Sequence, residues 1–168
     1  RVFGVADGLA SERVIALAEA PDGAIWIGSS GGGLTRMADG RVRADTTKDG
    51  LSSDRVMCLR IDPDGTVWAG TSGGGLNRVR EGKVATVTTR EGLFNDLVQV
   101  ILDGGRGSLW MTSNKGVFRV SRADPFSGCA GVTLRHPPAA ECYAHHIALL
   151  FPIVAGVEIG STDEIRLL

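Results

Sequence analysis

The sequence predicts an all-β protein that is built from three copies of one structural unit. Trp26, Trp68 and Trp110 lie 42 residues apart, and a fixed period of this size is typical of repeat architectures. The segments PDGAIWIGSSGGGL and PDGTVWAGTSGGGL, at 21–34 and 63–76, are nearly identical. Because each unit carries short apolar and β-branched runs between Gly-rich breaks, strands rather than helices are expected.

Each unit contains four candidate strands. In the first unit they span 14–20, 24–28, 34–37 and 41–47. Pro-Asp-Gly, Ser-Ser-Gly-Gly-Gly and Ala-Asp-Gly separate them, and all three favour turns. RVIALAEA could also form a helix, but it is short, ends at a turn, and its counterparts MCLRI and VQVIL favour strand. Four short strands per unit is the size of one propeller blade, so we expect a partial β-propeller of three four-stranded antiparallel blades.

The polarity of the strands predicts how the blades stack. The first strand is apolar on both faces, so it is expected to be buried between neighbouring blades. The fourth strand, 41–47 or 83–89, is polar and Thr-rich and is expected at the solvated outer edge. The three tryptophans are expected to have a structural role, packing between blades. The GGG runs are expected in loops that need positive φ or close backbone approach, since no GxxxxGK[ST] phosphate loop occurs.

The repeats do not extend over the whole chain. We expect three propeller-type repeats, followed by a divergent tail, at about 7–48, 49–90, 91–122 and 123–168. A fourth copy would place tryptophan where Pro152 stands, yet GVEIGST at 156–162 resembles AIWIGSS at 24–30. The tail is therefore either a degenerate fourth blade or an irregular end that no longer encodes the fold. Its apolar stretch 147–160 is shorter than the ~20 residues that span a bilayer.

Composition argues against several classes of function. The 168 residues carry a formal net charge of −1 without a block of like charges, so no nucleic-acid partner is expected. Cys58, Cys129 and Cys142 are odd in number and lack metal-ligand spacing, so neither a disulfide framework nor a metal site is expected, and no cofactor is indicated. Because the chain opens without an initiator Met or a leader, we expect a fragment or a processed product.

Meander geometry gathers candidate binding residues at one end of the blades, which we call the loop face. The Gly-rich loops and the connections DGLASER, DGLSSDR and EGLFNDL should emerge there. Rigid scaffolds usually carry binding groups on such loops. The candidate ligand-binding residues are Ser11, Arg13, Ser53, Asp54, Arg55, Ser72, Asn95, Asp96, Asn114 and Lys115. The alternative is that these side chains satisfy backbone groups of the turns.

These motifs resemble a known family. The pattern DGL-x-S-x-R-V followed by PDG-x-[IV]-W-[IA]-G-[ST]-S-GGGL-x-R resembles the two-component regulator propeller repeat. Residues 49–78 fit it position by position, 7–36 fit nearly as well, and 109–121 resemble the variant that often ends a run. The resemblance implies the extracytoplasmic sensor of a membrane-bound signalling protein, whose output is a histidine kinase, a hybrid kinase-regulator or a diguanylate cyclase. Ligands in that family are often carbohydrates or their breakdown products.

The resemblance therefore implies a ligand-sensing propeller fragment of a bacterial signal-transduction receptor, which is periplasmic or extracytoplasmic and binds a small molecule or carbohydrate on the loop face. The family's rings need seven or more blades, so further blades of the parent chain or self-association are expected partners. Contact with a membrane is expected only through a parent protein. An alternative is a structural or protein-interaction module.

A second alternative is an enzyme similar to streptogramin lyases, which carry related DG-x-[IL]-W repeats. That resemblance implies an elimination reaction with a His base and a metal ion. The three clear repeats contain no His, since His136, His145 and His146 all lie in the tail. No nucleophile and base can be paired within the repeats, so no catalytic residue is assigned and no enzymatic activity is expected.

Overall fold

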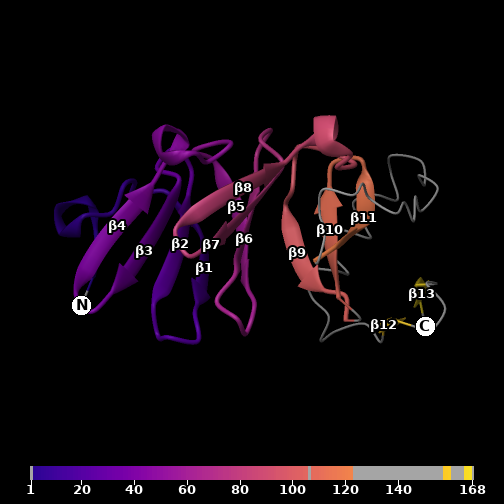
Figure 1. The fold of residues 1–168 in the computed structure, drawn as a ribbon, viewed down its shortest axis with the longest axis horizontal. Coiled ribbons are helices and arrows are strands. Elements are labelled where there is room, and N and C mark those ends of the chain that lie inside the picture. Colours follow the sequence, from indigo (N-terminus) through magenta and orange to yellow (C-terminus); the bar gives the residue numbers. More distant parts are fainter. Residues whose placement is uncertain (1, 106, 123–156, 160–164, 168) are drawn as a thin grey trace.

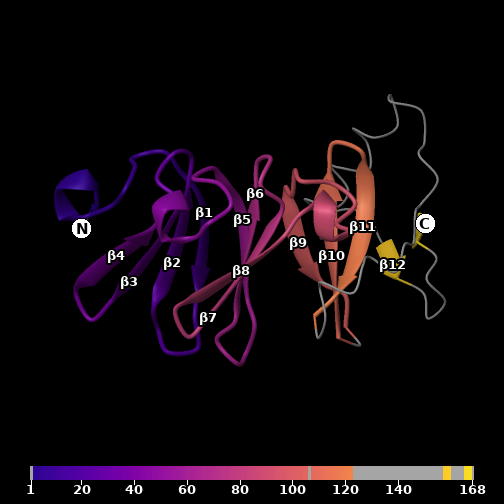
Figure 2. The same ribbon diagram turned by 45° about the horizontal axis from the view of Figure 1, so that its top comes forward.

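The computed structural model describes residues 2–105, 107–122, 157–159 and 165–167. Within these residues, two four-stranded sheets and one three-stranded sheet stand side by side, as two views show (Figure 1, Figure 2). All strand pairs are antiparallel, and each sheet is a meander in chain order. The expected fold class, an all-β partial propeller built from a repeated blade, is confirmed.

The strands follow the 42-residue period. The first blade contains β1 (Val14–Glu19), β2 (Ile25–Ser29), β3 (Leu34–Ala38) and β4 (Arg41–Asp45). The second contains β5 (Val56–Ile61), β6 (Val67–Thr71), β7 (Leu76–Arg80) and β8 (Lys83–Val87). The third contains β9 (Val100–Asp103), β10 (Ser108–Ser113) and β11 (Gly116–Ser121). Its expected fourth strand would follow Arg122, outside the described residues. In the tail, β12 (Val157–Ile159) pairs with β13 (Ile165–Leu167), and the other tail residues lie outside the described ranges.

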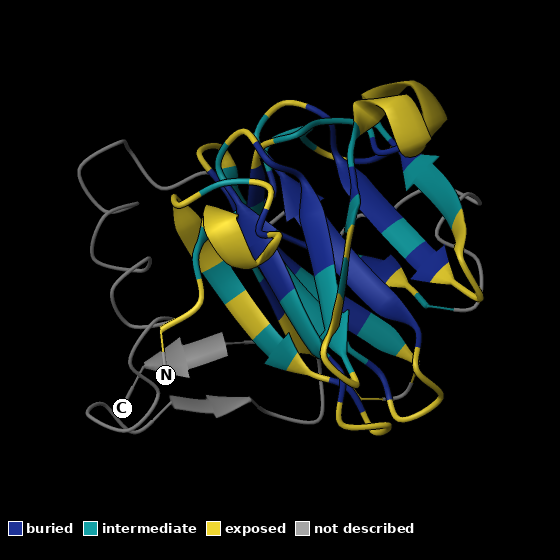
Figure 3. Cartoon of the chain, turned by 90° about the vertical axis from the view of Figure 1, so that its left-hand side faces the viewer, coloured by how far each residue is buried: buried dark blue, intermediate teal, exposed yellow. Residues whose placement is uncertain are grey.

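The fourth strand is shorter than expected. We expected it to run to Thr47 and Thr89, but β4 ends at Asp45 and β8 at Val87. The next residues form the 3-10 helices η2 (Thr47–Asp49) and η3 (Thr89–Glu91), and η1 (Val5–Asp7) precedes the first blade in the same way. These three helices are exposed (Figure 3). Thr46 and Thr88 end the strands because their hydroxyls accept backbone N–H groups of the following turn.

The tryptophans occupy equivalent register positions. Trp26 lies opposite Arg36, Trp68 opposite Arg78, and Trp110 opposite Arg119. The Trp68 side chain belongs to a buried cluster that includes blade-three residues, and Trp26 packs against the cluster formed largely by blade two. The blade-three members near Trp68 are Val98, Ile101, Leu109, Met111, Phe118 and Val120. The blade-two members near Trp26 include Val56, Val67, Ala69 and Val79.

The order of burial across a blade differs from the expectation. Contacts between neighbouring sheets concentrate on the first strands, so these strands lie at the inner edge of the arc. However, every residue of β6 is buried, whereas most residues of β5 are only partly buried. In β1, Leu17 is 66% exposed. The expectation of a first strand buried on both faces was therefore wrong, because a middle strand has a hydrogen-bonded neighbour on each side and a first strand has only one.

Candidate functional site

The DGL triplets build the connections on the loop face. Asp49 Oδ2 accepts the backbone N–H of Thr46 at 2.9 Å and its hydroxyl at 3.0 Å, which closes the 3-10 turn. Gly50 follows in the left-handed region with φ of 104°, where glycine is favoured. Leu51 is then buried in the core. Glu91 repeats the cap in the next connection, so the triplet is explained by local structure.

Backbone hydrogen bonds join each blade to the next along this face. Gly31 and Gly33 both donate to the carbonyl of Asp54, at 2.8 and 3.0 Å. Gly73 and Gly75 donate in the same way to Asp96, at 3.0 and 2.8 Å. As expected from the meander, the Gly-rich loops and the connections therefore share one end of the blades. In Figure 1 this end is at the top, where the 3-10 helices of the connections lie.

Five of the ten candidate side chains accept hydrogen bonds from nearby backbone groups. Ser53 Oγ accepts the N–H of Arg55 at 3.2 Å, and Asp54 Oδ1 accepts the N–H of Thr47 at 2.7 Å. Bonds of the same kind are made by Ser11, Asn95 and Asp96. These oxygens hold the connections in shape.

The remaining candidates present mostly donors. Arg13, Arg55 and Lys115 are exposed, and both arginines stand just before an inner strand. Asn114 Oδ1 accepts a hydrogen bond from Asn95 Nδ2 at 2.7 Å, which brings two candidates from one blade together. The backbone N–H of Ser72 donates to the carbonyl of Arg55 at 2.9 Å. The structure thus places all ten residues on the loop face.

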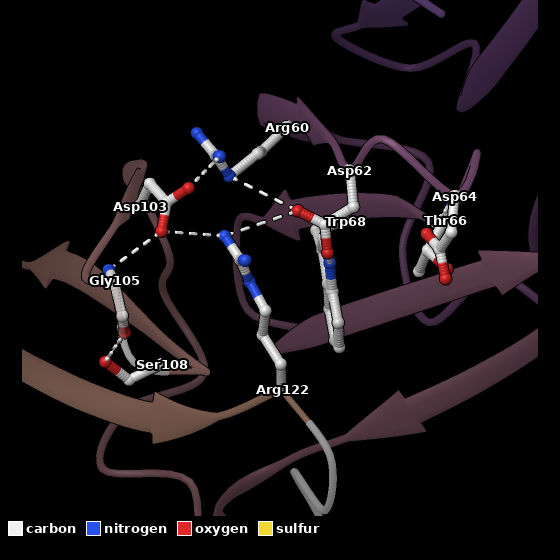
Figure 4. Close-up of polar contacts among 9 residues, drawn as sticks. All are labelled: Arg60, Asp62, Asp64, Thr66, Trp68, Asp103, Gly105, Ser108 and Arg122. Carbon is white, nitrogen blue, oxygen red and sulfur yellow. Dashed lines mark hydrogen bonds and ion pairs between the residues drawn. The ribbon is translucent and has the colours of Figure 1, made fainter. Parts of the chain in front are cut away.

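Sequence reasoning missed a charged cluster at the opposite end, which we call the hairpin end. Figure 4 shows it between the second and third blades. Trp68 Nε1 donates to Asp62 Oδ2 at 2.7 Å, and Asp62 Oδ1 lies 3.3 Å from an Nη2 of Arg122. Asp103 connects the two arginines, at 2.7 Å from Arg60 and 3.0 Å from Arg122. The cluster therefore ties the interblade tryptophan and the end of β5 in the second blade to the ends of β9 and β11 in the third.

A comparison of the repeats would have drawn attention to this cluster. Ala20, Asp62 and Gly104 are equivalent positions, since each backbone N–H donates to the carbonyl four residues later. Only the second unit carries a carboxylate there.

The pKa of Asp103 is lowered mainly by the backbone N–H of Gly105 and next by the Arg122 side chain. The acid is thus held in its charged form.

Other features limit the chemistry that the described residues offer. Among residues 2–105, 107–122, 157–159 and 165–167, no group of three or more His, Cys, Asp or Glu could hold a metal ion. Burial raises the pKa of the Cys58 thiol to about 12, so this sulfur is not a nucleophile near neutral pH. No helix in the described ranges is long and apolar enough to cross a membrane.

The family model of the two component regulator propeller matches residues 8–31 and 50–73. These two stretches are similar to the two-component regulator propeller repeat. Each match begins within a DGL triplet and ends within the following Gly-rich loop. Each match therefore covers the connection after its capping residue, the first two strands of the blade and the start of the Gly-rich loop, and the resemblance expected from the sequence is confirmed.

Several solved structures share this fold with the chain. The extracellular domain of BT3049 from B. thetaiotaomicron, a proposed hybrid two component system, is 25% identical with a TM-score of 0.59 over 70% of this chain. The extracellular domain of BT4673 from the same organism, a proposed one component system, is 21% identical with a TM-score of 0.57 over 71%. The chain spans only 16% and 18% of these two domains. No curated protein matches the chain significantly.

A lyase shares the fold as well. Virginiamycin B lyase from Staphylococcus aureus is 23% identical, with a TM-score of 0.54 over 66% of this chain and 39% of its own length. At this identity the likeness concerns the arrangement of blades. The propeller repeats described above contain no His, and the three His residues of the tail fall outside the described residues.

Proposed function

We propose that the chain is a ligand-sensing propeller portion of a bacterial signal-transduction receptor, with a loop face that contacts a small molecule or a carbohydrate. The observation that carries this proposal is the match of two units to the two-component regulator propeller. The similarity to the extracellular domain of a hybrid two component system supports it. On this proposal the repeats lie outside the cytoplasm, and the histidine kinase or diguanylate cyclase output belongs to other parts of the parent protein.

The chemistry of the loop face favours an oxygen-rich ligand. Its carboxylates Asp54 and Asp96 already accept hydrogen bonds from backbone N–H groups. The exposed groups of Arg13, Arg55 and Lys115 are donors. Hydroxyl, carbonyl or carboxylate oxygens of a ligand would complement them, and charge-assisted hydrogen bonds from guanidinium groups are the stronger kind.

The frame beneath these donors is rigid, which suits recognition. The N–H groups of the Gly-rich loops are bound to the connections of the next blade. A ligand that bridges Arg13 and Arg55 would contact two blades at once, because the two residues are equivalent positions of adjacent units. Ligand binding would then stabilise one arrangement of neighbouring blades, and this is a signal that a parent receptor can transmit.

The test is a thermal-shift screen of the full chain against neutral saccharides and uronic acids. We expect at least one of them to raise Tm, and Arg13→Ala and Arg55→Ala to reduce that rise. Arg41→Ala is the matched control, because Arg41 is exposed at the hairpin end, at the start of β4. An unchanged Tm with every saccharide would contradict the proposal and favour the interaction-module alternative. A rise that the two loop-face variants leave intact would place binding elsewhere.

A further inference from the structure

A groove opens between the first and second blades at the hairpin end. It encloses about 560 Å³, within the range of ~300–1,000 Å³ that is usual for small-molecule sites. Its wall from the first blade includes the half-buried ring of Trp26. The opposing wall comes from the Pro-Asp-Gly turn and the last hairpin of the second blade, through Asp64 and Glu81. The groove therefore lies at the end of the blades opposite to the loop face.

The repeat itself explains why the ring of Trp26 is accessible. In the second unit, Asp62 accepts the indole N–H of Trp68, which is 2% exposed. Ala20 stands at the equivalent position of the first unit. The same backbone hydrogen bond closes both turns, and it measures 2.8 Å in the first unit and 2.9 Å in the second. A methyl group cannot accept a hydrogen bond. Among the described residues no hydrogen bond to Trp26 is present, so its indole N–H is available to a ligand.

The charged side chains that the first blade contributes to the groove are paired with one another. Arg36 Nη2 lies 2.8 Å from Asp22 Oδ2, and Arg43 Nη2 lies 3.0 Å from Asp45 Oδ1. These pairs leave hydrogen-bonding capacity on both partners, since a carboxylate offers about four acceptor positions and a guanidinium five donors. They provide little net charge to attract an ion. A neutral ligand with many hydroxyl groups fits this arrangement better than an anion or a cation.

The second blade adds two further carboxylates, Asp64 and Glu81, to the lining of the groove. Arg80 Nη1 lies 3.1 Å from Asp64 Oδ2, and Arg80 Nε lies 3.9 Å from Glu81 Oε1. One arginine is thus shared by two carboxylates that line the groove. The equivalent groove between blades two and three differs, because Arg122 and Asp62 form part of its lining. Asp62 accepts the indole N–H of Trp68 there and also contacts Arg122.

We propose that the groove between blades one and two binds a neutral sugar residue. The apolar C–H face of a pyranose ring would rest against the indole of Trp26, whose ring has an apolar body and a polar N–H. Its hydroxyls would bridge the Asp22–Arg36 pair and the Arg43–Asp45 pair. This site is distinct from the loop face, so either proposal can fail while the other holds.

The test uses the full chain labelled with ¹⁵N in its tryptophans. Three indole N–H signals are expected from the three tryptophans, and Trp26→Phe assigns one of them. The chain is titrated with glucose, galactose, mannose and cellobiose, and with glucuronate and glucosamine as charged counterparts. We expect the Trp26 signal to shift and saturate at millimolar concentrations of a neutral sugar, and to respond less to its charged counterpart. The signal of Trp68 should stay in place.

Two variants make the test specific. Ala20→Asn supplies the acceptor that Asp62 supplies in the next unit, and the equivalent turn accommodates a side chain of that size. Ala20→Asn should raise the sugar concentration that half-saturates the Trp26 signal at least tenfold, whereas Arg55→Ala on the loop face should leave that concentration unchanged. Asp22→Ala, at an exposed pair, should weaken binding without affecting the fold. The proposal is overturned if no neutral sugar shifts the Trp26 signal, if all three indole signals move together, or if Ala20→Asn binds like the native chain.

Discussion

The indole N–H of Trp68 donates a 2.7 Å hydrogen bond to the carboxylate of Asp62. The equivalent tryptophans of the other units lack this partner, because Ala20 and Gly104 stand in place of the aspartate. The half-buried ring of Trp26 lines a groove, and Trp110 lies beneath the guanidinium of Arg119, 5.7 Å from the ring centroid. One repeated ring thus has three environments, and differences between the repeats decide where the interblade surface is open.

Removing the partner of Trp68 should destabilise the chain. Asp62→Ala leaves the indole N–H unpaired and deprives Arg60 and Arg122 of a carboxylate. We expect a loss of about 2–3 kcal/mol in the free energy of unfolding, measured by urea denaturation. Asp22→Ala is the control and should cost much less, because Asp22 and its partner Arg36 are both exposed. Equal losses for the two variants would show that the Asp62 cluster adds nothing to interblade packing.

The two interblade tryptophans should differ in their contribution to stability. Trp68→Ala removes a ring that is almost completely buried between blades two and three, and it should cost on the order of 3–5 kcal/mol. Trp26→Ala should cost less, since that ring is only half-buried. The measurement is again urea denaturation of both variants. A loss below ~1 kcal/mol for Trp68→Ala would mean that the ring is not part of the interblade core.

The glycines of the repeat should respond differently to alanine. At Gly50 the left-handed φ is the only obstacle, because the nearest atom to an added Cβ is Val84 Cβ at 3.9 Å. Gly50→Ala should therefore cost about 1–2 kcal/mol. At Gly75 an added Cβ would also overlap the carbonyl oxygen of Val87, so Gly75→Ala should cost about 3 kcal/mol or more. Thermal unfolding of both variants tests this order, and a reversed order would contradict the backbone described for the loop.

Stability should decrease in acid because the capping carboxylates have lowered pKa values. Asp49 owes its lowered pKa chiefly to the backbone N–H of Thr46, and Glu91 owes its own chiefly to the hydroxyl of Thr88. A group whose folded pKa lies below its unfolded pKa stabilises the fold above the unfolded value, and this contribution is lost as the pH falls through the folded value. We therefore expect Tm to decrease when the pH is lowered below about 4.

The control for the acid transition is the pair of substitutions Asp49→Asn and Glu91→Gln. This double variant should be less stable than the native chain at neutral pH and should show a flatter dependence of Tm on pH. Calorimetry across the acidic range tests both statements. A native chain whose Tm stays constant through the acidic range would show that the capping bonds are absent in solution.

The parts of the fold that could be predicted from the sequence are those fixed by turn residues. Pro-Asp-Gly favours tight turns, and glycine can adopt the positive φ angles that the loops between strands require, so the order of strands and the shared loop face followed from them. The early end of β4 could not be predicted, because it depends on the hydroxyl of Thr46 competing with strand pairing. The greater burial of β6 than of β5 depends on how neighbouring sheets meet.

The candidate site was predictable in position but less so in chemistry. Asp54 and Asp96 were placed on the correct face, yet their carboxylates bind backbone N–H groups seven residues earlier in the chain. Asp62 and Arg122 are far apart in sequence and meet only because two blades stack. The missing acceptor for the indole N–H of Trp26 likewise follows from a single difference between repeats, alanine in place of aspartate.

The most direct test of the stacked blades is hydrogen exchange at the amide of Gly75, measured by NMR on the full chain. Gly75 lies in a loop of three glycines, which would exchange rapidly if it were free. Its N–H donates to the carbonyl of Asp96 in the connection into the third blade, at 2.8 Å. The stacked arrangement predicts that this amide exchanges at least a hundredfold more slowly than an unstructured glycine, with similar protection at Gly33. Exchange of both amides at the unstructured rate would contradict the joining of neighbouring repeats along the loop face.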